Sequence, residues 1–355
     1  MPDDASTSAG SGPSCPLPLR VHETIQMAHG GGGRLMRDLI ETVFKRAFMN
    51  PALARSHDSA VLAAPAGRLA FTTDSYVVSP LVFPGGDIGK LAVCGTLNDL
   101  AMAGAAPLAL SAGFILEEGF PLEHLARIVE SMQAAAAAAG VAIVTGDTKV
   151  VDRGKGDGVF INTAGIGAVP DGVDVGPHRV QPGDVVVLSG DVGRHGVAIL
   201  SVREGLGFET SIESDCADLS PLVARLTAAG IELHCLRDLT RGGLASALNE
   251  IALDGQVEIA LDERAIPVSE AVAAASELLG LDPLHVANEG RMIAIVPATE
   301  ADRVLAAWRG HPAAPDPGVI GRVTGRDHPR VLLLNRLGGT RILDLLSGEQ
   351  LPRIC

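Results

Sequence analysis

Aromatic residues are scarce in this sequence of 355 residues, of which Phe, Trp and Tyr make up 3%. Hydrophobic residues nevertheless account for 47% of the chain. The core must therefore consist mainly of Ala, Val, Leu and Ile packed in regular elements. This composition favours a protein that mixes helices and strands, and the length allows about two domains of ordinary size.

Basic residues are also few, since 28 Lys and Arg face 42 Asp and Glu, giving a net charge of -14. A protein that binds the phosphate backbone of a nucleic acid needs clustered Lys and Arg, and no basic stripe is visible. The composition therefore argues against a nucleic-acid partner. It does not argue against a nucleotide, because carboxylates can hold Mg²⁺, which in turn holds phosphates.

Long apolar runs are missing as well. The nearest candidate, at 132–144, is an Ala-rich stretch that is too short and too mildly apolar to span a bilayer. The first residues are acidic and rich in Ser, Gly and Pro, without the apolar segment of a signal peptide. We therefore expect a soluble protein that does not contact the membrane.

Cysteines are few and follow no metal-binding spacing. The five are odd in number and lack a CxxC pair, and a chain of this size needs no disulfides to fold. A reducing, cytoplasmic location is the simplest expectation. The cysteines are Cys15, Cys94, Cys216, Cys235 and Cys355.

Changes of composition divide the chain into five parts. Residues 1–20 lack periodicity and are predicted to be a disordered leader. Residues 21–55 contain a glycine-rich loop and one amphipathic helix, and 56–170 alternate short β-rich runs with helical stretches, as an α+β domain does. A turn-rich boundary leads to a second α/β domain at 180–330. Residues 335–355 are predicted to be a mobile tail.

Several aspartates directly follow apolar runs or begin helices. Asp58, Asp74, Asp99 and Asp147 each have small neighbours that leave room for phosphates, and Asn98 precedes one of them. Hard cations need carboxylates that converge, so the four predict a Mg²⁺ site beside a nucleotide. Taken singly, each aspartate is more simply a turn or cap residue.

Two glycine-rich motifs stand before predicted helices. His29 precedes a run of four glycines whose backbone N–H groups could hold an anion, although no Gly-Lys-Ser/Thr follows and a flexible linker is the simpler alternative. Asp238 and Thr240 precede a double glycine, which indicates either a plain helix start or a close backbone approach to a ligand. The four glycines are Gly30, Gly31, Gly32 and Gly33.

Two charged residues and the last residue are candidates for catalysis. Lys149 and Glu289 both follow apolar runs and lack a partner at i,i+4, so in a shared cleft Glu289 could act as a base with its pKa tuned by Lys149. A solvated surface is the alternative. Cys355, at the very end of the chain, is a thiol on an arm that could visit more than one site, unless it is an accidental frayed end.

Taken together, these strings resemble the HypE family of hydrogenase maturation proteins, in the superfamily of aminoimidazole ribonucleotide synthetase, selenophosphate synthetase and thiamine-monophosphate kinase. The similarity covers about residues 25–355, and the terminal PRIC is its most specific part. The matching strings are HGGGG at 29–33, TDS at 73–75, GTLNDLAM at 95–102, GDTKVV at 146–151, RDLTRGG at 237–243, NEG at 288–290 and PRIC at 352–355.

The resemblance implies a two-domain fold in which the N-terminal sheets of a homodimer form a barrel, with ATP between the domains of each subunit. It implies that the carbamoyltransferase HypF loads Cys355 with a carbamoyl group. ATP-dependent dehydration then gives a thiocyanate, the source of the cyanide ligands of the NiFe-hydrogenase iron, with a HypC–HypD complex as acceptor.

The resemblance also implies roles for individual residues. Glu289 and Lys149 remove the imidate proton, and Gly30 to Gly33 cover the phosphates. Asp74, Asn98, Asp99, Asp147, Thr148 and Asp238 contact the nucleotide. Mg²⁺ is held by Asp58, Asp74, Asp99 and Asp147. The sequence around Asp58 departs from the family's usual Gly-Asp-Asp-Ala-Ala form, which weakens its assignment as a ligand.

Two rival functions remain at this point. An ATP-dependent synthetase or kinase of the same superfamily, acting on a small molecule, would not need Cys355. A selenophosphate synthetase would need a reactive Cys near the glycine run, which has none. A non-enzymatic adaptor that docks through its tail would leave Lys149 and Glu289 without a role. Deletion of the C-terminus separates the dehydratase from the small-molecule enzymes.

Overall fold

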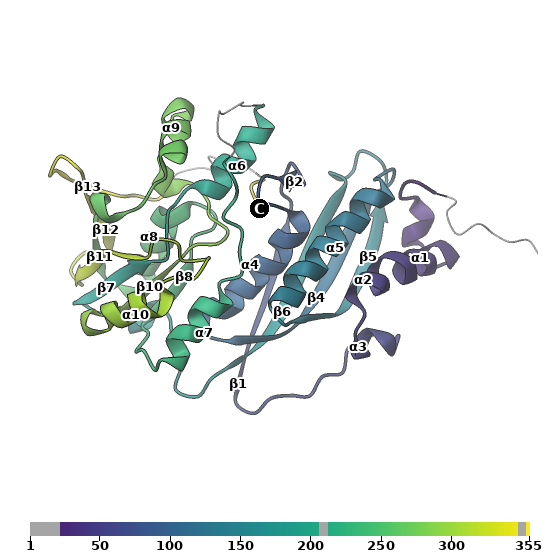
Figure 1. The fold of residues 1–355 in the computed structure, drawn as a ribbon, viewed down its shortest axis with the longest axis horizontal. Helices are drawn as coiled ribbons and strands as arrows, with labels where there is room; N and C mark the ends of the chain where they lie inside the picture. The colour runs from purple at the N-terminus through teal and green to yellow at the C-terminus, as the bar shows by residue number, and fades with distance from the viewer. Residues whose placement is uncertain (1–21, 206–211, 347–352) are drawn as a thin grey trace, which may run out of the picture.

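The computed structural model describes residues 22–205, 212–346 and 353–355. The chain forms two lobes that lie side by side (Figure 1). Each lobe is built on one large β-sheet, so the structure is a mixed α and β fold as the composition predicted.

The N-terminal lobe contains a four-stranded sheet in the order β1-β6-β4-β5. Strands β4 and β5 are parallel, and the other two pairs are antiparallel. Helix α5 (Leu122–Ala138) makes the crossover between the parallel strands, and α4 (Ile88–Met102) packs on the sheet as well. The strands are β1 (Arg68–Tyr76), β4 (Ala106–Glu117), β5 (Ala142–Val151) and β6 (Val159–Val169).

The sequence explains how these two helices pack. In α5 the buried residues recur at helical spacing and form one apolar stripe: Leu125, Ile128, Val129, Met132 and Ala136. Helix α4 begins where the Asp87 side chain accepts a hydrogen bond from the Lys90 N–H, and it is buried along most of its length because both lobes contact it. A short hairpin, β2 (Val82–Phe83) and β3 (Gly86–Asp87), precedes it.

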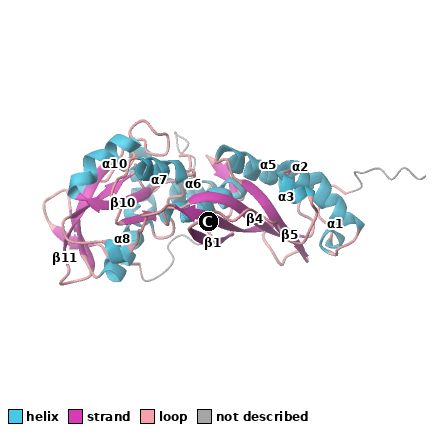
Figure 2. Cartoon of the chain, turned by 90° about the horizontal axis from the view of Figure 1, so that it is seen from below, coloured by secondary structure: helices cyan, strands magenta, loops and turns pink. Residues whose placement is uncertain are grey.

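The opposite face of this sheet carries exposed hydrophobic side chains. Figure 2 shows α5 along one side of β4 and β5. On the other side Leu69, Phe71 and Ile115 are exposed, and Phe71 is 71% accessible to solvent. Since large apolar groups on one sheet face are normally covered, this face is a candidate interface.

Short helical segments precede β1. They are η1 (Met27–Gly30), α1 (Arg34–Leu39), η2 (Ile40–Lys45), α2 (Arg46–Phe48) and α3 (Pro51–Ala54). The predicted amphipathic helix corresponds to the continuous run from α1 to α2, with Leu39, Phe44 and Phe48 buried. It ends before Asn50, whose side chain caps α3 by accepting from the Ala52 and Leu53 N–H groups.

The C-terminal lobe contains a seven-stranded sheet in the order β13-β12-β9-β11-β7-β10-β8. Its strands are β7 (Asp184–Leu188), β8 (Cys235–Asp238), β9 (Glu258–Asp262), β10 (Met292–Pro297), β11 (Gly318–Gly325), β12 (Arg330–Leu334) and β13 (Thr340–Ile342). The helices are α6 (Arg194–Arg203), α7 (Ser220–Ala228), α8 (Gly243–Gly255), α9 (Glu270–Leu279) and α10 (Ala301–Trp308).

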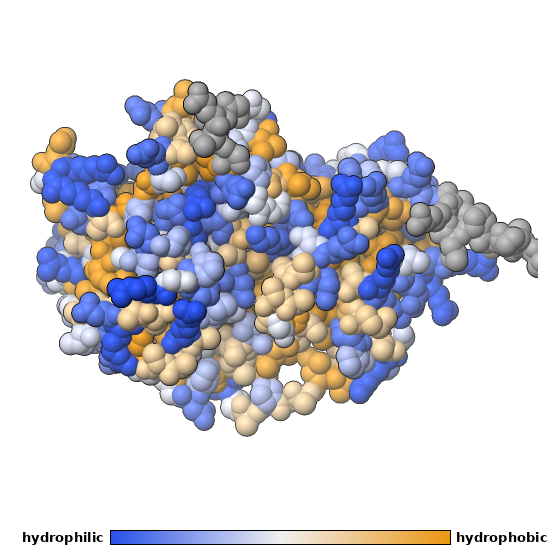
Figure 3. Space-filling model, in the orientation of Figure 1, coloured by the Kyte–Doolittle hydropathy of each residue, from blue (hydrophilic) through white to orange (hydrophobic). Residues whose placement is uncertain are grey.

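Strands at the centre of this sheet are buried on both faces. In β10, Ile293 and Ile295 join the cluster that includes α8, while Met292 and Ala294 join the cluster with α7 and α10. Both faces of the sheet are therefore covered, which is why β7 and β10 read as uninterrupted apolar runs. On the face seen in Figure 3, hydrophilic side chains are spread over both lobes.

The predicted tail begins in ordered structure. Strand β13, which lies inside the range 335–355, pairs with β12, and Leu343 after it is fully buried. Residues 347–352 lie outside the described part of the chain, as does the predicted leader at 1–20 with Cys15. The last three residues return to the N-terminal lobe, where Ile354 joins the hydrophobic cluster beneath α4.

Candidate active site between the lobes

Three aspartates meet where the lobes join. Asp74 comes from β1, Asp99 from α4 and Asp238 from the end of β8. Burial raises the pKa of Asp99, a hydrogen bond of 2.8 Å from Thr72 Oγ1 opposes this, and the charge of Asp74 adds to the rise. Burial, reinforced by Asp99, raises the pKa of Asp238 to about 7. The neighbouring Arg237 opposes both rises only in part, and a bound cation would oppose them further.

Glu289 is buried close to these aspartates. Its side chain lies in the loop before β10 and is only 3% exposed, and its Oε1 has no hydrogen-bond partner among the described residues. Burial, with Asp238 and Asp215 next in importance, raises its pKa well above the usual value for a carboxyl group. An orphaned buried carboxylate oxygen indicates a site that is completed by a ligand.

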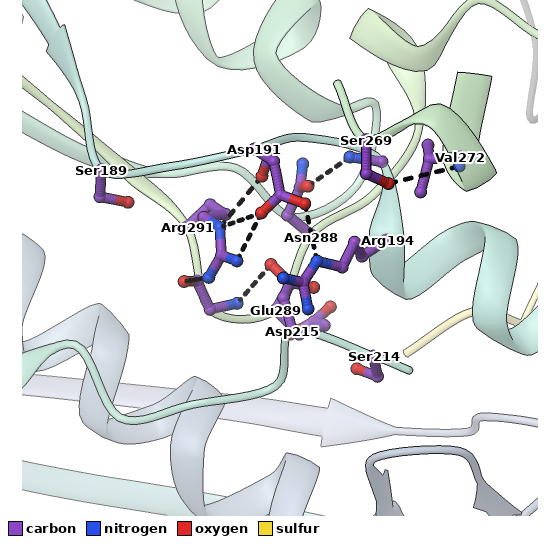
Figure 4. A network of polar contacts seen from close by, with 12 residues as sticks. Ser189, Asp191, Arg194, Ser214, Asp215, Ser269, Val272, Asn288, Glu289 and Arg291 are labelled. Carbon is purple, nitrogen blue, oxygen red and sulfur yellow. Dashed lines mark hydrogen bonds and ion pairs between the residues drawn. The ribbon is translucent and has the colours of Figure 1, made fainter. Parts of the chain in front are cut away.

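A polar network holds the Glu289 loop in place (Figure 4). Both oxygens of Asp215 accept main-chain N–H groups, from Glu289 and from Gly290, each at 3.2 Å. The approach is tight, because a Cβ on Gly290 would lie 1.9 Å from the carbonyl oxygen of Asp215. Only glycine fits at this position, and Asp215 therefore sets the position of the Glu289 backbone.

The residues on either side of Glu289 are anchored in the C-terminal lobe. The buried Arg291 forms an ion pair of 2.7 Å with Asp191, which also binds Arg194. These two guanidinium groups lower the pKa of Asp191 although its burial acts in the opposite direction. Asn288 Oδ1 accepts from the Gly193 N–H at 2.7 Å. Glu289 thus sits on a rigid support, as a group that must be aimed at a substrate requires.

The end of the chain docks at the same junction. Cys355 packs against a hydrophobic cluster that contains Cys94, Cys216 and Ala287. Cys94 is near enough to Glu289 to contribute to its raised pKa. Cys94, Cys216 and Cys235 are buried, and of the four cysteines in the described structure only Cys355 is partly exposed. Because a nucleophile must be reachable, Cys355 is the candidate reactive thiol.

Burial also makes Cys216 and Cys235 poor nucleophiles. Contact with Cys94, together with burial, raises the pKa of Cys216 well above the usual value. Burial raises the pKa of Cys235 to about 12.

Asp147 and Lys149 lie away from this cluster within one chain. Asp147 on β5 is in register with Gly113 on β4, Asn162 on β6 and Ser75 on β1. Three strand spacings therefore separate Asp147 from β1, a distance of roughly 14 Å. It shares the face of Ser75, whereas Asp74 points to the opposite face. The four predicted metal ligands therefore do not form one group in a single chain.

Lys149 is not beside Glu289 in the chain, contrary to our expectation of a shared cleft. It forms an exposed ion pair of 2.7 Å with Asp147, which lowers the pKa of that carboxyl. The physical reason is strand geometry, because residues two apart in a strand lie on the same face. The absence of an i,i+4 partner, which we used as a criterion, is informative only in a helix.

The glycine run lies next to β5. A Cβ on Gly30 would be 2.7 Å from the Val150 nitrogen, and Gly32 has a φ of +76°, so both positions favour glycine. Thr148, which points to the helix-covered side of β5, lines a pocket together with Asp147 and Phe44. Gly30, Asp147, Thr148 and Lys149 thus form a second group at the β5 edge.

Two further predicted residues have other surroundings. Asn98 is buried, and both ends of its side-chain amide are hydrogen-bonded within the chain. Its Oδ1 accepts from the Leu219 N–H at 2.8 Å and its Nδ2 donates to the Ala217 carbonyl at 3.1 Å. It ties α4 to the C-terminal lobe. Asp58 is exposed in the segment between α3 and β1, and no described hydrogen bond or ion pair links it to Asp74, Asp99 or Asp147.

No three His, Cys, Asp or Glu side chains of the described residues are close enough together to hold a metal ion by themselves. This arrangement still fits Mg²⁺, which usually keeps several waters and binds through one or two carboxylates plus substrate phosphates. Asp74, Asp99 and Asp238 supply such carboxylates.

Every helix in the described ranges is too short or too polar to cross a bilayer.

Comparison with known proteins first defines the class. Residues 56–169 match the family model "AIR synthase related protein, N-terminal domain", and 181–333 match the corresponding C-terminal domain. The fold is also similar to a thiamine-monophosphate kinase from Stenotrophomonas maltophilia, with a TM-score of 0.63 at 20% identity over 82% of this chain and 96% of that one. The chain is thus a two-domain protein of the AIR synthase type.

More similar relatives define the particular family. The carbamoyl dehydratase HypE of Azotobacter vinelandii is 58% identical over 94% of this chain and 97% of the relative, and HypE of Escherichia coli K12 is 50% identical over 93% and 99%. A crystal structure of the hydrogenase maturation protein HypE in complex with ATP has a TM-score of 0.90 at 47% identity, covering 93% of this chain and 99% of that one. The chain belongs to the HypE family, which confirms the resemblance and the predicted fold class.

Proposed function

We propose that this chain is an ATP-dependent carbamoyl dehydratase that converts an S-carbamoyl group on Cys355 into a thiocyanate, the source of the cyanide ligands of the NiFe-hydrogenase iron. The observation that carries the proposal is the position of the C-terminus. Ile354 is buried, and Cys355 packs against the cluster that includes Cys94, which is near enough to Glu289 to contribute to its raised pKa. The reacting sulfur is therefore part of the protein's own chain.

The chemistry explains why ATP is needed. A carbamoyl oxygen leaves poorly as water and well as phosphate, so transfer of the terminal phosphoryl group of ATP to that oxygen activates the group. Loss of the N–H protons and of phosphate then leaves a carbon–nitrogen triple bond on the sulfur. The overall change is S-carbamoyl plus ATP to thiocyanate, ADP, phosphate and a proton, and the carbamoyl oxygen ends in the phosphate.

Glu289 has the properties of the base in this reaction. It is buried near Cys94, its Oε1 is unpartnered among the described residues, and its pKa is raised, which makes it a stronger base once it is ionised. The Asp215 contacts fix the main chain at this position. We assign to Glu289 the removal of an N–H proton from the activated carbamoyl group.

We propose that Asp74, Asp99 and Asp238 hold Mg²⁺ with the nucleotide. A bound cation would neutralise charge on the phosphates. The raised pKa values of Asp99 and Asp238 are compatible with this role, because burial, with repulsion between neighbouring aspartates as a smaller cause, disfavours their ionised forms and a bound cation would favour them. Asp238 takes the place that we first gave to Asp58 and Asp147.

We further propose a homodimer formed through the open face of the N-terminal sheet, where Phe71 and Ile115 are exposed. Lys149 and Asp147 lie on this same face and would point toward the partner subunit. In this arrangement Lys149 contributes to proton removal only after assembly. This proposal accounts for its separation from Glu289 within one chain.

We infer the partners from the same family. A HypE–HypF complex has been solved for a protein 47% identical to this chain, with a TM-score of 0.77 over 87% of this chain and 99% of that one. HypF would load Cys355, and a HypC–HypD complex would receive the cyanide. Since the terminal sulfur must stay reduced to be loaded, we propose a cytoplasmic location.

The test is mass spectrometry of the C-terminal peptide after incubation with HypF, a carbamoyl donor and Mg²⁺-ATP. The peptide is expected to gain a carbamoyl group and then to lose one water. A Cys355→Ser variant should show neither change, while Cys235→Ser, which replaces a buried cysteine elsewhere, should show both. A carbamoylated peptide that never loses water would contradict the proposal.

A further inference from the structure

The docked tail is recognised largely through its main chain. The Val77 N–H donates to the main-chain oxygen of Cys355, and the Ser79 N–H donates to the Arg353 carbonyl, both at 3.2 Å. The two bonds run antiparallel and hold the tail against residues 77–79, which directly follow β1. Among residues 353–355, Ile354 alone has a buried side chain, at 3% exposure.

One buried side chain completes this recognition. His195, at the start of α6, is inaccessible to solvent and its Nε2 lies 2.8 Å from the Ile354 carbonyl oxygen. Its Nδ1 lies 2.8 Å from Ser214 Oγ, which accepts from the Cys216 N–H at 3.0 Å. Phe83 packs edge-on against the imidazole, with ring centroids 5.4 Å apart, and fixes the plane of the ring.

The partners of His195 determine its protonation. A carbonyl oxygen can only accept, so Nε2 carries the proton and donates to Ile354. Nδ1 of the neutral ring then accepts from the Ser214 hydroxyl. Burial lowers the pKa of His195, which agrees with a neutral ring. The hydrogen bonds from the Cys216 N–H through Ser214 and His195 to the tail thus all pair a donor with an acceptor.

The segment 214–216, which contains Ser214, also contacts the loop of the proposed base, Glu289. Ser214 contacts His195, and its neighbour Asp215 accepts the N–H groups of Glu289 and Gly290. The segment is also anchored to the N-terminal lobe, because the Ser214 N–H donates to the Pro84 carbonyl at 2.8 Å. The contacts that hold the tail and those that hold the Glu289 loop therefore share one support.

We propose that His195 is a positioning residue that places the terminal cysteine for dehydration by holding the Ile354 carbonyl. The segment 214–216 connects this contact to the Glu289 loop, so the sulfur and the base are aligned together. The inference deepens the proposed function and rests on it for its catalytic meaning. The docking contact itself is testable without any turnover.

The first test measures how fast a maleimide alkylates Cys355 in the full-length protein, followed on the C-terminal peptide. His195→Asn keeps an acceptor for Ser214 but is too short to reach Ile354. Loss of one buried donor should raise the alkylation rate by about 5- to 30-fold. His195→Gln, whose amide nitrogen can occupy the Nε2 position, should restore most of the protection.

Two variants control for general destabilisation. His234→Asn replaces another buried histidine, which pairs with Asp184 and has no described contact with the tail. It should leave the alkylation rate of Cys355 unchanged. Ser214→Ala keeps the imidazole but removes the hydroxyl that hydrogen-bonds its Nδ1, and it should give an intermediate rise even if His195→Asn folds poorly. Thermal unfolding of each variant is measured in parallel.

The second test follows single-turnover loss of water from the carbamoylated tail. His195→Asn should slow this step about tenfold, because a misplaced sulfur reacts more slowly, with loading by HypF unchanged, and His195→Gln should recover it. Equal alkylation in wild type and His195→Asn, or equal effects of Asn and Gln, would overturn the inference. If protection behaves as expected while wild type never dehydrates its tail, the proposed function fails and the docking contact stands.

Discussion

Replacing Asp238 with Asn should stabilise the ligand-free protein at alkaline pH. Burial and the neighbouring Asp99 raise the pKa of Asp238 from 3.8 to about 7 in the folded state. A folded-state pKa above the unfolded value means that the folded carboxyl holds its proton more tightly. Ionisation of Asp238 therefore destabilises the folded state. The free energy of unfolding declines as pH rises from the unfolded pKa and levels off above about 7.

The magnitude follows from the shift. The interval between 3.8 and about 7 corresponds to an upper bound of about 4 kcal/mol, at about 1.4 kcal/mol for each pH unit. Structural relaxation reduces this, so we expect Asp238→Asn to be more stable than wild type by about 2 kcal/mol at pH ~8 and nearly equal at pH ~4. The amide keeps the shape of the side chain and removes only its charge.

The assay is urea unfolding of both proteins across this pH range, with and without Mg²⁺-ATP. Ligand should stabilise wild type more than the variant, because the variant lacks a carboxylate that we assign to the cation. A variant that is no more stable than wild type at high pH would refute the reasoning. So would a difference that is independent of pH.

Three other variants test separate parts of the account. Glu289→Gln should slow dehydration about a hundredfold or more and leave loading of Cys355 intact, as the C-terminal peptide mass will show; equal rates would exclude Glu289 as the base. Phe71→Glu should convert the proposed dimer to a monomer, as measured by light scattering. Leu278→Glu, also 71% exposed but on α9, should leave the dimer intact. A dimeric Phe71→Glu protein would exclude the open face of the N-terminal sheet as the interface. Gly30→Ala should lose about 1–3 kcal/mol in denaturant unfolding because its Cβ would collide with β5, whereas Gly33, with open space around it, should tolerate Ala; equal stabilities would contradict the packing.

Part of the site could be predicted because the relevant residues have local signals. Asp74 and Asp99 stand beside apolar runs, and Asp238 precedes a double glycine that opens α8. Such positions lie at the ends of core elements, where polar side chains from different elements can meet. The two-lobe α and β fold followed from the alternating runs in the same way.

Other residues had no signal that a single sequence could reveal. His195 and Asp215 act through contacts with the tail and the Glu289 loop, which are distant in the chain. A buried histidine looks the same in sequence as an exposed one. The expectation that Lys149 lies beside Glu289 failed for a different reason. Successive side chains of a strand point to opposite faces of the sheet, and the sequence alone does not reveal which face the helices cover.

The most direct test of the account is to load Cys355 with a carbamoyl group that carries heavy oxygen and to add Mg²⁺-ATP. If ATP activates the carbamoyl oxygen on the terminal sulfur, the label should appear in the inorganic phosphate as the thiocyanate forms. Label found in water, with unlabelled phosphate, would contradict the central claim that the oxygen leaves as phosphate from the chain's own last residue.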